Sequence, residues 1–145
     1  MSMDLFLACV RDGKESEFER RLVDEVMGRG AVNPEFPLEE VRYVDGGSEV
    51  HVHKNDGEGA KTVSFRRFGG ETFFCRLFEL ANRTGSFLFW AGNGYGVAVT
   101  DRAMLVHLPP GVEDDSLGLP FIVKNGEELE AAIIYGIGPS GVGDD

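Results

Sequence analysis

Two histidines, His51 and His53, stand two residues apart in the segment EVHVHK, where polar and apolar residues alternate. Such alternation predicts a β-strand, and side chains two apart on a strand point to the same face. Two imidazoles on one strand face can hold a metal ion, but a catalytic metal site normally takes three protein ligands. With Glu49 beside them in the pattern E-x-H-x-H, the pair indicates either a metal site or a solvated strand face.

The spacing of these histidines relative to Glu58 adds a family resemblance. The pattern His51-x-His53-x4-Glu58 resembles the first metal motif of the cupins, with Phe65 standing where that motif has a trailing glycine. The later stretch HLPPGVED has a Pro-Gly turn but no following histidine. The resemblance implies a small metal- or ligand-binding protein with these three residues as its ligands, which we keep as an alternative function.

A cluster of glycines in FLFWAGNGYGVAVTD, residues 87–101, raises the question of a phosphate-binding loop. A dinucleotide fingerprint needs G-x-G-x-x-G between a strand and a helix, whereas Val97 occupies the third glycine position here. The segment after it, VAVT, is β-branched and predicts a strand. Asn93-Gly94 is a favoured pair for a tight turn, so the cluster predicts a hairpin. Trp90 and Tyr95 flank this turn, either packed on the sheet or exposed as aromatic anchors for a partner.

Carboxylates are the chemically active groups that the chain holds in excess. The net charge is −11, and residues 103–145 hold eight acids against one base. Phosphate and anionic membrane surfaces require clustered Lys and Arg, so we expect neither nucleic acid nor membrane as a partner. A basic protein surface is the natural complement of such a chain. Adjacent acids at Asp114-Asp115 and Glu127-Glu128 lie in a loop and at a helix start, where solvent and the helix dipole stabilise them.

The two cysteines, Cys9 and Cys75, sit among large apolar residues in LFLACV and TFFCRLF. We expect both to be buried small hydrophobic residues, because a disulfide framework needs more cysteines in a shorter chain. The first apolar run is too short for a signal peptide and lacks a basic start, so we expect a cytoplasmic protein without cofactors.

The elements that would position these residues form an α+β fold of one domain, residues 1–137, followed by a flexible Gly-rich tail at 138–145. We expect an antiparallel sheet of about six or seven strands with two to three helices packed mainly on one face. The strands are predicted at 3–10, 41–44, 49–54, 61–68, on either side of Asn93-Gly94, 103–109 and 121–123. The helices are predicted at 15–30, with Ser16 as the cap, at 71–85, and at 125–136, with Asn125 and Glu128 in a capping box.

In general character the chain resembles the immunity proteins that bacteria pair with toxins, and acidic inhibitors of basic enzymes. That resemblance implies tight one-to-one binding of a cognate protein whose cationic groups meet carboxylates of this chain. The sequence therefore favours a binding protein over an enzyme, without deciding between them. The predicted partner-binding residues are Glu113, Asp114, Asp115, Glu127, Glu128 and Glu130, with Trp90 and Tyr95 as apolar anchors.

Overall fold

The computed structural model describes residues 4–32, 34–54, 59–91, 95–108 and 120–136. The tail predicted at 138–145 lies outside this part of the chain. The described strands are β1 (Asp4–Arg11), β2 (Lys14–Glu15), β3 (Phe18–Glu19), β4 (Glu40–Tyr43), β5 (Gly46–Lys54), β6 (Gly59–Gly69), β7 (Ser86–Ala91), β8 (Tyr95–Val99) and β9 (Phe121–Ile122). The described helices are α1 (Arg21–Met27), α2 (Glu71–Thr84), the 3₁₀ helix η1 (Arg102–His107), α4 (Gly126–Glu130) and the π-helical turn η2 (Ala131–Tyr135).

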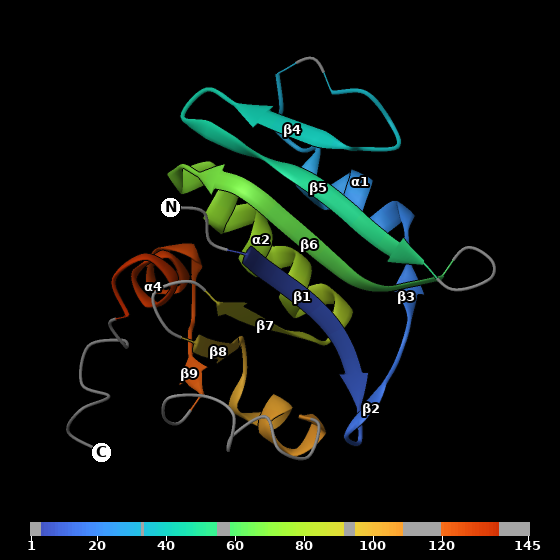
Figure 1. Ribbon diagram of the computed structural model, residues 1–145, viewed down its shortest axis with the longest axis vertical. Helices are drawn as coiled ribbons and strands as arrows, with labels where there is room; N and C mark the ends of the chain where they lie inside the picture. The colour runs from blue at the N-terminus through green and yellow to red at the C-terminus, as the bar shows by residue number, and fades with distance from the viewer. Residues whose placement is uncertain (1–3, 33, 55–58, 92–94, 109–119, 137–145) are drawn as a thin grey trace.

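The strands form one twisted sheet in the order β4-β5-β6-β1-β7-β8-β9, with β2 paired to β1 and β3 to β6 (Figure 1). The pair β8–β9 is parallel, and the other pairings among the described strands are antiparallel. The predicted α+β class and the meander of β4, β5 and β6 are confirmed. The main path has seven strands, and the two short strands off it, β2 and β3, are additions that the sequence pattern did not predict.

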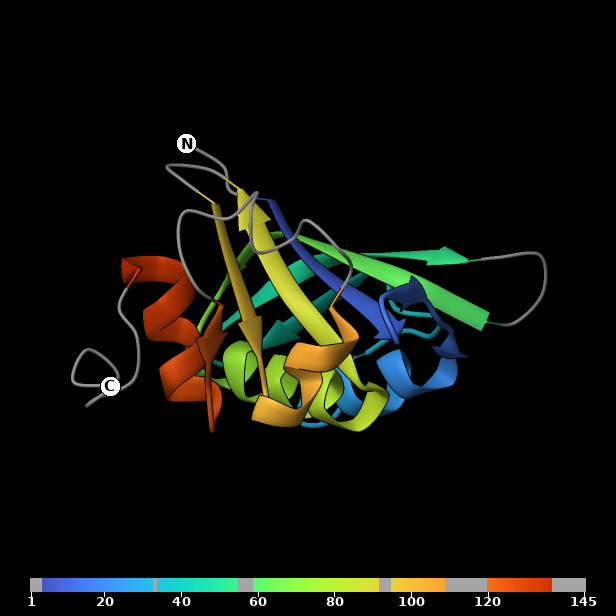
Figure 2. The ribbon, with the colours of Figure 1, turned by 90° about the horizontal axis from the view of Figure 1, so that it is seen from below.

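The helices α1, α2 and α4 cover one face of the sheet, and Figure 2 shows α1 and α2 side by side beneath the strands. Strand residues that point to this face are fully buried, as in Leu5, Leu7, Val63 and Phe65. Their neighbours along β5 and β6 point the other way and meet solvent. The sheet therefore has one buried face and, at the β4–β5–β6 end, one wet face, as the alternation in β5 predicted.

The helix α2 is the central element of the buried layer. Its buried residues are Phe73, Phe74, Leu77, Leu80 and Ala81, and it ends at Gly85 in the left-handed conformation, as predicted. Cys75 lies between two of these residues, yet its side chain is exposed, so the expectation that it is buried is wrong. The reason is the 100° turn per residue, which carries position 75 away from the stripe formed by positions 73, 77 and 80. Cys9 is buried as expected, and burial raises the pKa of its thiol.

A second apolar cluster lies on the opposite face, at the β7–β8 end. Val10, Phe87, Val97 and Val99 form it, and the half-buried Met104 and Leu105 of η1 pack against it. The segment 103–109 was predicted as a strand, but 102–107 is helical. Asp101 begins this helix, because its carboxylate accepts a hydrogen bond of 2.9 Å from the Ala103 amide. A short apolar run fits a strand and a helical turn equally well, so the cap decides the structure.

The first helix is shorter than the sequence pattern predicts. Residues 14–19 contribute the short strands β2 and β3, and α1 begins only at Arg21 instead of after Ser16. Phe18 pairs with Ala60 of β6 and is 9% exposed, so tertiary pairing overrides the helical spacing of this segment. Among the described residues, no helix is long and apolar enough to span a membrane.

Candidate functional site

The helical segment formed by α4 and η2 carries the described part of the predicted acidic surface. Asn125 begins it, with its side-chain oxygen accepting a 2.8 Å hydrogen bond from the Glu128 amide. The Glu128 carboxylate in turn accepts a 2.8 Å bond from the amide of Lys124. The predicted cap is therefore present, with the return bond one residue earlier than in the standard capping box. Glu128 thus holds the start of the helix, whereas the capping bonds engage neither Glu127 nor Glu130.

The inner side of this segment is fixed against α2 by close packing. Leu129 and Ala132 are fully buried, and Ile133 is 2% exposed. At Gly126 a β-carbon would lie 2.7 Å from backbone atoms of Cys75, which is closer than any real contact of that kind. Glycine is thus required where the two helices meet, and the segment has one fixed orientation on the domain.

The outer side of the same segment presents acids followed by large apolar side chains. Glu127 is exposed and Glu130 half-buried, whereas Ile134 is 44% and Tyr135 70% exposed. Glu127 and Glu130 are three residues apart in α4, which places them on one helix face, and Ile134 and Tyr135 follow about one turn later in η2. We call Glu127, Glu130, Ile134 and Tyr135 the outer stripe. Its apolar end lies in the π-helical turn, a feature that occurs frequently at functional sites.

The predicted aromatic anchor Trp90 belongs to the core. It is 5% exposed, stacks on Phe121 with ring centroids 6.1 Å apart, and pairs with Gly96 across β7 and β8. A β-carbon on Gly96 would lie 2.2 Å from the indole ring, so this glycine makes room for the tryptophan. Trp90 thus packs on the sheet, which was one of the two interpretations of this residue, and its prediction as a partner-binding anchor is wrong. The strands around that cluster form the predicted antiparallel hairpin, although residues 92–94 lie outside the described chain.

Three of the predicted acids and one aromatic cannot be placed with the outer stripe. Glu113, Asp114 and Asp115 lie outside the described residues, and for Tyr95 the structure describes the backbone in β8 but not the side chain. The acids that the structure does bring together are Glu127, Glu128 and Glu130. The exposed apolar residues beside them, Ile134 and Tyr135, are ones that sequence reasoning missed. The sequence did hold a signal for them. Their spacing from Glu127 places them on the side of the predicted helix away from Leu129 and Ile133.

The two histidines lie on the wet face of β5, as the alternation predicted. Both His51 and His53 are exposed, and the ring of His53 lies 3.3 Å from the Ser64 hydroxyl on the neighbouring strand. Glu58, the third ligand that the cupin resemblance implies, lies outside the described residues. Within the described part of the chain, no group of three His, Cys, Asp or Glu side chains could hold a metal ion.

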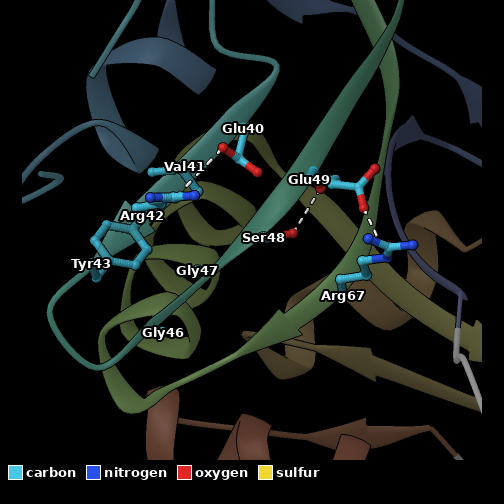
Figure 3. A pocket seen from close by; sticks show the side chains of 9 residues that line it. All are labelled: Glu40, Val41, Arg42, Tyr43, Gly46, Gly47, Ser48, Glu49 and Arg67. Atoms are coloured by element: carbon cyan, nitrogen blue, oxygen red, sulfur yellow. Dashed lines mark hydrogen bonds and ion pairs between the residues drawn. The ribbon is translucent and has the colours of Figure 1, made fainter. Parts of the chain in front are cut away.

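A hollow of about 330 Å³ lies over the β4–β5 hairpin, and its lining is shown in Figure 3. The guanidinium groups of Arg42 and Arg67 lie 3.7 and 3.3 Å from the carboxylates of Glu40 and Glu49, respectively. The Ser48 hydroxyl lies 2.7 Å from the Glu49 carbonyl oxygen, so it is engaged with the backbone. Cations and anions are therefore balanced in this hollow, and it offers no activated nucleophile.

Two side chains with shifted pKa values, Tyr43 and Asp45, support the fold. Burial raises the pKa of the Tyr43 phenol, whose hydroxyl donates a hydrogen bond to the Met27 carbonyl at the end of α1. The Thr72 amide, 2.9 Å from the Asp45 carboxylate, lowers the pKa of that acid. Asp45 thus caps α2 from the β4–β5 turn, because Gly70 at the N-cap has no side chain to do so. These two groups connect helices to strands, and neither lies on the outer stripe.

Comparison of the chain with protein-family models, with curated proteins and with solved structures gave no match.

Proposed function

We propose that this protein binds and neutralises a cognate protein partner one-to-one, as an immunity or inhibitor protein acting on a toxin or another basic enzyme. The single observation that supports this proposal best is the outer stripe, where Ile134 and Tyr135 are exposed beside two carboxylates. Large exposed apolar groups next to polar ones are typical of protein interfaces, and tyrosine is enriched among the residues that dominate their energy.

The two halves of the outer stripe have different physical roles in this proposal. Glu127 and Glu130, within a chain of net charge −11, attract a cationic surface and accelerate encounter. Tyr135 and Ile134 then lose their exposed surface in the complex, which slows dissociation. An alanine scan of such an interface typically finds a loss of about 2 kcal/mol or more at a central tyrosine. We therefore expect Tyr135 to control the off-rate and the two acids to control the on-rate.

The acids at 113–115 remain part of the proposed surface as a prediction. They precede β9 in the chain, and α4 follows β9. Charge reversal at Glu113, Asp114 and Asp115 is expected to slow association. An unchanged association rate would remove these three residues from the surface.

Site-specific photocrosslinking tests the location of the surface. A photoreactive phenylalanine analogue is placed at position 135 in one variant and at position 44 in another, and each is irradiated in the cells that produce the protein. Val44 is the matched control, because it is also an exposed hydrophobic residue, 96% exposed at the tip of the β4–β5 turn. We expect one basic protein to crosslink in a 1:1 adduct at position 135 and not at 44.

The crosslinked protein must then be inhibited when the two purified chains are mixed. Inhibition that reaches completion at one equivalent supports neutralisation, whereas binding without inhibition contradicts it. Equal crosslinking at positions 135 and 44 would remove the outer stripe as the binding surface.

A further inference from the structure

The connection between α1 and β4 exposes two large apolar side chains. Phe36 is 60% and Val32 is 47% exposed, although both belong to a connection that also contains Pro34 and Pro37. We call the described residues of 31–39 the proline loop. An exposed aromatic beside an exposed aliphatic group is a feature that marks interaction surfaces.

The proline loop is held in place from beneath by a half-buried ion pair. The Arg20 guanidinium donates to the Asp24 carboxylate at 2.9 Å and to the Leu38 carbonyl at 3.1 Å. The same carboxylate accepts a 2.9 Å bond from the Leu38 amide, and the Leu38 side chain is buried. At its other end, the Val32 amide donates to the Arg42 carbonyl at 2.8 Å. The loop is thus fixed at both ends, and the exposure of Phe36 belongs to a preorganised structure, which lowers the entropy cost of binding.

Two hollows border the proline loop. The larger, of about 440 Å³, has walls of Val32 and the two prolines, and its polar lining is Glu35, Glu39, Glu40 and Arg42. The smaller, of about 260 Å³, lies between Phe36 and α1 and is lined by Phe36, Arg21, Asp24 and Glu25. Apolar and charged groups therefore alternate across this surface.

The charges of the larger hollow select the partner. Arg42 lies 3.7 Å from Glu40 and balances it, whereas Glu35 and Glu39 form no ion pair with another described side chain. The hollow is thus net negative beside an exposed valine. A lysine or arginine matches both properties, because its aliphatic stem packs on apolar surface while its charged end meets carboxylates.

The smaller hollow is closer to electrical balance. Each of its charged residues has a partner outside it: Arg21 pairs with Glu19, Asp24 with Arg20, and Glu25 with Arg83. What remains for a ligand there is the exposed ring of Phe36, which suits an apolar side chain.

We infer that the proline loop is a docking surface for a protein segment that presents an apolar side chain next to a lysine or arginine. The apolar side chain packs on Phe36, and the cationic one enters the larger hollow. This surface is separate from the outer stripe. The proline loop adjoins the edge strand β4, whereas α4 follows β9 at the opposite edge of the sheet, and Figure 1 shows them at different ends of the molecule. The inference does not rest on the proposed function.

Amide chemical shifts of the full chain provide the test, with three short synthetic peptides as probes. One peptide alternates lysine and leucine, the second glutamate and leucine, and the third lysine and serine. We expect the lysine–leucine peptide to shift the amides of the non-proline residues in 34–42 with a dissociation constant below about 1 mM. The glutamate–leucine and lysine–serine peptides should bind at least about tenfold more weakly, because each lacks one of the two required groups.

Substitutions separate the contribution of the Phe36 ring to peptide binding from that of the carboxylates in the larger hollow. Phe36→Ser and Glu39→Gln are each expected to weaken the lysine–leucine peptide several-fold, and both residues are exposed, so the fold and its amide spectrum should persist. Val44→Ser, an equally apolar and exposed position outside both hollows, should change binding less than about twofold. The inference is overturned if no peptide binds, if the lysine–serine peptide binds as tightly, or if the shifted amides lie elsewhere.

Discussion

The ion pair beneath the proline loop makes a quantitative prediction about stability. Asp24→Ala removes one carboxylate oxygen that accepts two hydrogen bonds, from Arg20 and from the Leu38 amide, each of 2.9 Å. The side chains of Arg20 and Asp24 are only 11% and 21% exposed, so solvent replaces these bonds poorly. A hydrogen bond to a charged group contributes about 1.5–3 kcal/mol, and a donor left unsatisfied costs about 1–3 kcal/mol.

Because Arg20 keeps its bond to the Leu38 carbonyl, we place the loss toward the lower end of the cost of breaking a buried ion pair. Asp24→Ala is expected to lower the free energy of unfolding by about 2–4 kcal/mol. Asp24→Asn keeps an oxygen for the Leu38 amide but loses the charge, so it should cost about 1–2 kcal/mol.

Urea unfolding of the two variants measures both values, provided that the denaturant slope stays constant. Hydrogen exchange of the Leu38 amide gives an independent readout, since that amide loses its acceptor only in Asp24→Ala. Glu19→Ala is the control, because it removes a carboxylate that pairs with Arg21 at the surface. The Glu19 side chain is 64% exposed, so this substitution should leave the urea midpoint unchanged. An Asp24→Ala variant as stable as the natural chain would refute the account of how this loop is held.

Three further predictions test contacts that join one structural element to another. Gly126→Ala forces a β-carbon into the backbone of α2 and should lower the free energy of unfolding by about 1–3 kcal/mol, as measured in urea. Tyr43→Phe leaves the Met27 carbonyl without its buried donor and should lower the melting temperature, by an amount equivalent to about 1–3 kcal/mol. The pKa of Asp45 is lower in the folded chain than in the unfolded chain. Its contribution to the free energy of unfolding is therefore fully present above the unfolded pKa and is lost as the pH falls through the folded pKa. The stability advantage of the natural chain over Asp45→Ala should therefore shrink below about pH 4, and an advantage independent of pH would exclude the bond to the Thr72 amide.

Local patterns were sufficient to predict the parts of the fold in which one face is polar. The alternation around His51 and Val50 predicted β5 and its wet face, and the apolar stripe containing Phe73 and Leu77 predicted α2. The turn residues Asn93-Gly94 predicted the antiparallel pairing of the strands on either side of them, β7 and β8. For β5 and α2 the sequence pattern and the burial in the structure have the same period.

The sequence was insufficient where both faces of a strand are covered, where a side-chain cap sets the conformation, and where a residue pairs with a distant strand. β7 is covered on both faces near η1, so its pattern could not decide whether Trp90 points to the core or to a partner. The segment 102–107 became helical because of the cap at Asp101, a side-chain bond that a search for apolar runs does not detect. Phe18 was assigned to a helix from the local spacing of apolar residues. Its pairing with Ala60 joins residues far apart in the chain, and a local pattern does not detect such a pairing.

The candidate site was only partly accessible to sequence reasoning for a related reason. Acidic residues are visible in the sequence, and Glu127 and Glu130 were predicted correctly as neighbours on one helix. Whether an apolar residue near them is exposed depends on which face packs against α2. That choice is fixed by the close contact at Gly126, a tertiary feature that left Tyr135 on the surface.

The measurement that tests the central claim most directly is a titration of the crosslinked partner's activity with the purified protein and with Tyr135→Ser. We predict complete inhibition at a ratio of one to one by the natural chain, and at least about tenfold weaker binding by Tyr135→Ser. Glu127→Lys should slow association, and the decrease should be larger at low salt than at high salt. Val44→Ser should associate and inhibit as the natural chain does. Equal inhibition by Tyr135→Ser and the natural chain, with no effect of salt, would contradict the account.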